Sequence, residues 1–113
     1  MLTFNVKKVW FDKIKSGEKT HEYREVKPYW TNRLANFLDL QDEDFKVLEY
    51  SKLIFQDYPY FCFRLGYTKE YLEAYIVSLA KVNGKNTDLA VDKNVYDIEF
   101  ELIKEQTNEE SEG

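Results

Sequence analysis

The chain has 113 residues, which suffice for one hydrophobic core and are too few for two ordinary domains. Hydrophobic residues make up 43% and aromatic residues 17% of the chain, so a disordered chain is excluded as the main reading. No apolar run approaches the roughly 20 residues of a membrane-spanning helix, and we expect a soluble, cytoplasmic protein with no membrane partner. The lone Cys62 cannot form an internal disulfide and is expected to be buried.

The charge is unevenly distributed along the chain. The formal net charge of -5 disfavours a general affinity for nucleic acid. Residues 1–34 nevertheless hold eight Lys or Arg against four Asp or Glu, and four acidic residues lie in the last nine, 105–113. We therefore expect one domain over residues 1–104 with a basic first third, followed by an acidic flexible tail over 105–113.

The first third of the chain predicts a strand, a helix and a second strand. Residues 2–6 alternate apolar and polar side chains, as in a half-buried strand. The apolar residues of 9–16 have helical spacing, and Gly17 is typical of a helix end. The segment 18–25 contains the β-branched Thr20 and the aromatic Tyr23 and predicts the second strand.

The middle of the chain predicts a helix, a loop and two strands. Pro28 suits the first turn of a helix, which should end near Asp39. The polar, acidic segment 39–47 predicts a loop. Strands are predicted on both sides of a turn at 57–59, and the second of them should end at Gly66.

The last third of the chain predicts strands. Residues 70–82 fit a helix or a strand, and we prefer the strand, whereas 95–102 alternate strictly. Five or six strands and two early helices, without crossover helices between the later strands, predict an α+β fold. The best fit is a small, mostly antiparallel barrel with the two helices packed at its side.

Charged residues gather where the first helix should lead into the second strand. Their pattern is Gly17-x-Lys19-x-x-Glu22-x-Arg24. In a strand Glu22 and Arg24 point to the same face, so they can form an ion pair or contact a ligand together. Lys19, next to the turn, can reach round to them because its side chain is long.

This pattern resembles the signature of the ASCH superfamily, named for activating signal cointegrator homology. The order of the expected strands and helices also resembles the PUA-like β-barrel of that family, over roughly residues 2–104. The segment 23–33 is similar to small ASCH proteins of bacteria and their phages.

The resemblance implies a cleft for RNA, a nucleotide or a modified nucleoside. We expect no cofactor and no metal. Lys and Arg can hold phosphate, a carboxylate can accept hydrogen bonds from base amino groups or sugar hydroxyls, and aromatic rings can stack on bases. The residues expected to contact the ligand are Lys19, Glu22, Arg24, Tyr29, Trp30, Arg33, Arg64 and Tyr67.

Several alternatives stay open. One ASCH lineage is an acetylcytidine amidohydrolase that uses Lys, Thr and Glu; Lys19 matches its Lys, but Glu22 stands where that lineage has Thr. Its nucleophile is therefore absent, and Lys19 and Glu22 are weak candidates for acid–base catalysis on a modified nucleoside. Glu22 and Arg24 can instead form a structural ion pair in a protein-interaction domain. Trp30 can be a core residue, and the single His21 does not predict a metal site.

Overall fold

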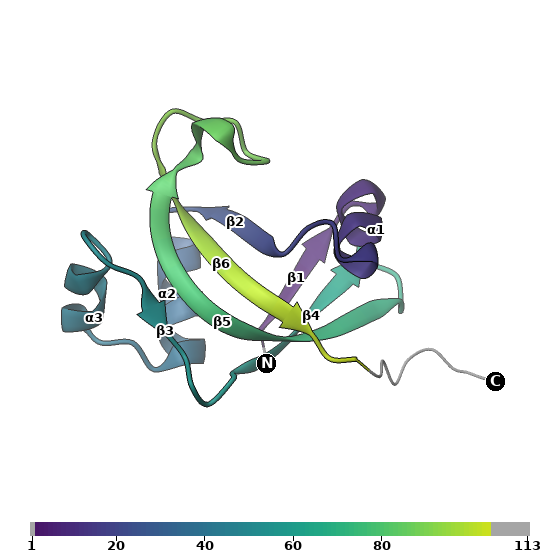
Figure 1. The fold of residues 1–113 in the computed structure, drawn as a ribbon, viewed down its shortest axis with the longest axis horizontal. Coiled ribbons are helices and arrows are strands. Elements are labelled where there is room, and N and C mark those ends of the chain that lie inside the picture. The colour runs from purple at the N-terminus through teal and green to yellow at the C-terminus, as the bar shows by residue number, and fades with distance from the viewer. Residues whose placement is uncertain (1, 105–113) are drawn as a thin grey trace.

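The computed structural model describes residues 2–104 and has an α+β fold (Figure 1). The helices are α1 (Lys8–Ser16), α2 (Pro28–Leu38), α3 (Asp42–Val47) and the 3-10 helix η1 (Gly84–Asn86). The strands are β1 (Thr3–Val6), β2 (His21–Glu25), β3 (Leu53–Ile54), β4 (Tyr60–Leu65), β5 (Tyr71–Asn83) and β6 (Asn94–Leu102). The tail predicted at 105–113 lies outside the described residues.

The six strands form one mostly antiparallel sheet. Its order is β1-β4-β5-β6-β2, with β3 paired to β5, and β1 runs parallel to β4. The long strands β5 and β6 curve together through the fold (Figure 1), and a β-bulge interrupts their register between Ile76 and Ser78. The α+β class and the mostly antiparallel sheet are confirmed. The described pairings leave β1 and β2 as edge strands, so barrel closure stays a prediction.

Aromatic side chains form the centre of the core. Phe4 of β1, Phe61 and Phe63 of β4 and Phe100 of β6 are at most 3% exposed. Their ring centroids lie between 4.7 and 6.2 Å apart in the contacting pairs. Such rings fill a small core with few side chains, and Cys62 beside them is buried as predicted.

Helix α3 corrects the sequence analysis, which predicted a loop over 39–47. Gln41 and Asp44 form a capping box at its start, in which the Gln41 N–H donates to Asp44 Oδ2 over 2.8 Å. Acidic residues in the first turn are also favourable near the positive end of the helix dipole. Phe45 then packs against the core, so the acidic run begins a helix.

The described part of the chain has no helix whose length and apolarity would suit it to span a membrane. Helices α1 and α2 agree with the predicted pair. α2 begins at Pro28, and α1 is followed by Gly17 in the left-handed conformation.

Candidate functional site

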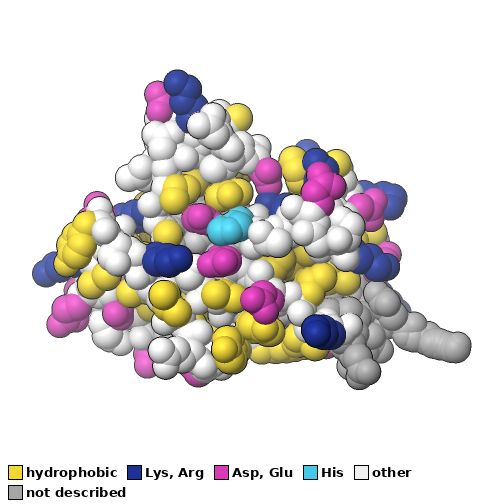
Figure 2. Space-filling model, in the orientation of Figure 1, with side chains coloured by type: hydrophobic (Ala, Val, Ile, Leu, Met, Phe, Trp, Pro, Cys, Tyr) yellow, Lys and Arg dark blue, Asp and Glu magenta, His cyan; other side chains and the backbone are white. Residues whose placement is uncertain are grey.

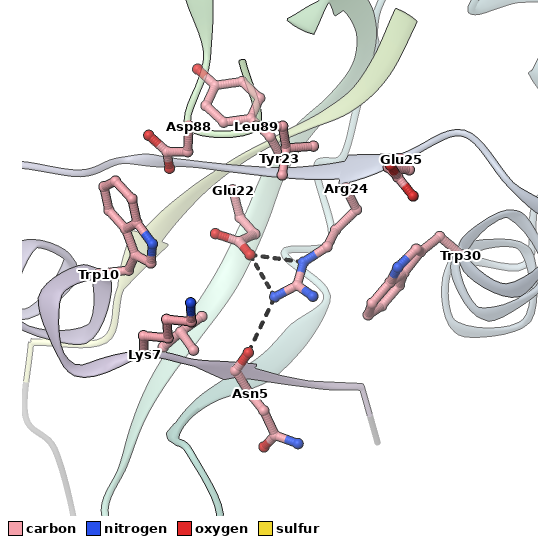
Figure 3. Close-up of a pocket in the computed structure, with 11 residues that line it drawn as sticks. Asn5, Lys7, Trp10, Glu22, Tyr23, Arg24, Glu25, Trp30, Asp88 and Leu89 are labelled. Atoms are coloured by element: carbon pink, nitrogen blue, oxygen red, sulfur yellow. Dashed lines mark hydrogen bonds and ion pairs between the residues drawn. The ribbon is translucent and has the colours of Figure 1, made fainter. Parts of the chain in front are cut away.

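A pocket of about 310 Å³ opens between the two edge strands (Figure 3). Its walls come from the end of β1, from α1, β2 and α2, and from the loop between β5 and β6. The volume lies at the lower end of the range of about 300 to 1,000 Å³ typical of small-molecule sites. The pocket therefore suits one small ligand or one unit of a larger one.

Glu22 and Arg24 form an ion pair in this pocket. Arg24 Nε and Nη2 lie 2.8 and 2.6 Å from Glu22 Oε2. Arg24 Nη2 also donates to the backbone oxygen of Asn5 over 3.4 Å, so this side chain joins β2 to β1 where the strands do not pair. The other terminal nitrogen, Nη1, makes no hydrogen bond with residues 2–104 and can donate to a ligand.

Aromatic rings hold the guanidinium group of Arg24 in place. Its carbon Cζ lies 4.8 Å from the ring centroid of Phe4 and 4.7 Å from that of Trp30. Across the pocket, Trp10 of α1 faces the same ion pair (Figure 3). The two indoles thus flank a carboxylate and a guanidinium, an arrangement that can receive a flat polar ligand.

Lys19 supports Glu22 from outside the pocket. Its Nζ lies 3.4 Å from Glu22 Oε1, donates to the carbonyl of His21 over 2.6 Å and pairs with Asp88. Its side chain is only 8% exposed and lines the neighbouring hollow. The ammonium group of Lys19 is therefore held by three acceptors and does not line the pocket.

Gly17 directs the chain toward Lys19. Its φ of +87° is left-handed, and its N–H donates to the carbonyl of Ile14 over 3.1 Å. The N–H of Lys19 then donates to the carbonyl of Lys13 over 3.0 Å. The glycine of the motif therefore has a backbone role, since other residues take this conformation at a cost.

The remaining predicted site residues lie at different distances from the pocket. Trp30 lines it, and Tyr29 is edge-on to Trp30 at 5.0 Å and 57% exposed. Arg33 stacks on both rings and lines a different hollow, with no lining residue in common with the pocket. Arg64 and Tyr67 lie together in a third hollow, on β4 and the turn after it, and do not reach the pocket.

Lys7, Trp10 and Asp88 line the pocket but were not among the predicted site residues. Asp88 lies 69 positions from its partner Lys19, in a turn-rich segment, so no local pattern pointed to it. The helical spacing of Trp10 placed it on α1 without indicating which way it faces. For Lys7, the only sequence signal was its place in the basic first third of the chain.

Tyr23 and His21 alternate along β2 with Glu22 and Arg24; both line the neighbouring hollow, and Tyr23 also borders the pocket. Burial raises the pKa of Tyr23, and the carboxylates of Asp97, Asp88 and Glu22 raise it further, so this phenol stays protonated at neutral pH. His21 Nδ1 lies 2.6 Å from Asp97 Oδ1. Figure 2 shows the histidine among acidic side chains, but residues 2–104 contain no group of three His, Cys, Asp or Glu that could hold a metal.

The fold and the site together define an α+β domain with a small pocket of aromatic and charged residues between the two edge strands of its sheet, β1 and β2. Comparison of the chain with protein-family models, curated proteins and solved structures finds no match. The geometry of the pocket is therefore the basis for a functional proposal.

Proposed function

We propose that the chain is an ASCH-like binding domain that holds a nucleobase, from RNA, a nucleotide or a modified nucleoside, in the pocket between β1 and β2. The observation that carries the proposal is the Glu22–Arg24 pair between the indoles of Trp10 and Trp30. Under this proposal the sheet is an open form of a PUA-like barrel, in which Arg24 bridges the edges of β1 and β2.

The pocket offers the contacts that a base requires. Stacking of a base on an aromatic ring contributes about 1 to 3 kcal/mol in single-strand binders. Arg24 Nη1 supplies a donor, and Glu22 Oε1, held by Lys19 at 3.4 Å, can accept a further hydrogen bond. A donor next to an acceptor is complementary to the edge of a nucleobase.

Binding is better supported than hydrolysis of an acylated nucleoside. Lys19 keeps its ammonium group on three acceptors, and Glu22 is neutralised by two cations. Neither group is free to transfer a proton without first breaking an ion pair. The amidohydrolase alternative predicts turnover of an N-acylated cytidine that depends on Lys19, which chromatography of the incubated nucleoside measures directly.

Intrinsic fluorescence gives a direct test, because the chain has two tryptophans and both line the pocket. Nucleosides, nucleotides and short RNA should change the emission in a saturable way. Arg24→Ala should weaken binding at least tenfold, about 1.4 kcal/mol. The matched control Arg64→Ala removes an exposed arginine from the separate hollow and should bind as the parent does.

Arg24→Lys separates a binding defect from a folding defect. The lysine keeps a positive charge beside Glu22 but lacks the planar fork of donors. We expect it to retain the unfolding midpoint more closely than Arg24→Ala does, and still to bind weakly. An affinity unaffected by both substitutions, or no saturable change with any nucleoside or RNA, would reject the proposed function.

A further inference from the structure

The carboxylates that line the pocket are all paired with cations. The pairs are Glu22 with Arg24 and Lys19, Glu25 with Lys27 and Lys93, and Asp88 with Lys19. Counted with Lys7, which also lines the pocket, these groups comprise five positive and three negative charges. Of these groups, Lys7 and Arg24 line the pocket together with the three carboxylates, so the lining itself carries a net charge of -1 and the other three cations compensate it from outside.

Lys7 is a pocket cation whose ammonium group makes no ion pair or hydrogen bond with residues 2–104. It directly follows β1, and its carbonyl accepts the N–H groups of Trp10 and Phe11 over 3.0 and 2.9 Å, which fixes its backbone. Figure 3 shows its side chain at the β1–α1 side of the pocket, on the same side of β2 as Glu22 and Arg24. Its charge is therefore available to an anionic ligand.

Arg33, on helix α2, is a second cation without an ion pair among residues 2–104; it lines a different hollow and contacts the pocket residue Trp30. Its Cζ lies 5.4 Å from the ring centroid of Tyr29 and 5.6 Å from that of Trp30. Its buried Nε has no hydrogen-bond partner within residues 2–104, and the group forms no ion pair there. Since Arg24 lies 4.7 Å from the same Trp30 ring, the two guanidinium carbons are at most about 10 Å apart.

We infer that the pocket takes an internal nucleotide of a single RNA strand, with the base on the neutralised Glu22–Arg24 pair and the flanking phosphates on Lys7 and Arg33. This inference rests on the proposed function. An uncharged base edge suits a carboxylate and guanidinium that already compensate each other, whereas phosphates seek unpaired cations. Lys7 and Arg33 come from different elements, so the strand passes from the β1–α1 junction to α2.

Tryptophan fluorescence can compare a nucleoside with a trinucleotide of the same base, which has two phosphates. The trinucleotide should bind at least tenfold more tightly. The logarithm of its association constant should fall with the logarithm of the salt concentration with a slope of about -1.4. This value corresponds to two phosphate contacts at about -0.7 each in a single strand. Nucleoside affinity should be indifferent to salt.

Single substitutions assign the two contacts. Lys7→Ala and Arg33→Ala should each remove about half of the salt slope for the trinucleotide and weaken trinucleotide binding more than nucleoside binding. Lys8→Ala is the matched control for Lys7, because Lys8 is the adjacent residue, pairs with Asp12 at 2.9 Å and does not line the pocket. Arg64→Ala serves the same purpose for Arg33, and both controls should keep the full slope.

The outcomes separate the two proposals. A trinucleotide that binds no more tightly than a nucleoside, while nucleoside binding still requires Arg24, would overturn the inference and leave the proposed function in place. If neither the nucleoside nor the trinucleotide shows binding that requires Arg24, the proposed function itself is overturned. Arg33→Ala and Arg33→Lys could each lower the affinity for the nucleoside as much as the affinity for the trinucleotide. That result would mean that Arg33 packs against Trp30 and does not contact phosphate, which overturns its part of the inference.

Discussion

Glu22 is the residue on which the charges of the site converge. One of its oxygens accepts from two nitrogens of Arg24, and the other faces Lys19 at 3.4 Å. Its side chain is only 7% exposed, so water contributes little to its solvation. A carboxylate buried to this degree depends on its cations, and the cations depend on it.

Replacing Glu22 should therefore destabilise the fold. Glu22→Gln keeps the shape but leaves two cations beside a neutral group, and we expect a loss of about 3 kcal/mol in the free energy of unfolding. This loss lies at the lower end of the range of about 3 to 5 kcal/mol for breaking a buried ion pair. Lys19 would still pair with Asp88, and the Arg24 side chain is 20% exposed to water. Urea unfolding measures this loss.

Glu25→Gln is the matched control, three positions further along the same strand. Its side chain is 40% exposed and its contacts to Lys27 and Lys93 are 3.4 and 3.7 Å long. A surface pair of this kind contributes less than about 1 kcal/mol. Equal losses for the two variants would mean that burial of Glu22 does not govern its energetic role.

At the scale of elements, the turn from α1 into β2 determines where Lys19 lies. Gly17 ends the helix with φ +87°, and no atom lies within 4 Å of the position a Cβ would take. A substitution at this residue therefore meets backbone strain without a steric clash.

Gly17→Ala should lower the free energy of unfolding by about 1 to 2 kcal/mol, the cost of a left-handed residue with a Cβ. Gly17→Asn should cost less, because Asn tolerates this conformation through local hydrogen bonds. Urea unfolding of the two variants gives the comparison. If Ala and Asn were both neutral, the chain would have another way to end α1, and the glycine of the motif would need a different explanation.

The elements also show how local signals can compete. The apolar residues of 70–82 fitted both the spacing of a helix and the alternation of a strand. The segment forms strand β5 because it pairs with β4 on one side and with β6 on the other. The acidic residues of 42–44 suggested a loop by their polarity, yet they occupy the first turn of α3, where negative charge is favourable.

At the scale of the whole molecule, Phe4 connects the core to the site. Its ring contacts Phe61 and Phe63 at 5.6 and 5.9 Å on the core side. It also lies 5.3 Å from the ring of Trp30 and 4.8 Å from Arg24 Cζ. Packing of the core and the position of the guanidinium group are therefore coupled through one side chain.

Phe4→Leu should reduce stability and ligand affinity together. We expect a loss of about 1 to 2 kcal/mol in unfolding free energy, between a conservative core change and truncation to Ala. Phe100→Leu, in the same core, is the control, since Phe100 packs on Phe61 and Phe63 and has no ring contact with Trp30 or Arg24.

Thermal unfolding and tryptophan fluorescence measure the two properties on the same samples. The two variants should lose similar stability, and only Phe4→Leu should weaken binding of nucleoside or RNA. Equal affinities would show that Arg24 keeps its position without Phe4.

The sequence by itself determined most of the elements and the shared strand face of Glu22 and Arg24. Side chains two apart share a strand face, and helical spacing, Pro28 and Gly17 are local signals read without knowing the fold. Tertiary structure alone decided the rest. It brought Asp88 to Lys19, turned Trp10 to the pocket and placed Arg64 in another hollow. Those positions depend on strand order and on which faces meet, which are set by long-range pairing and packing and leave no local pattern.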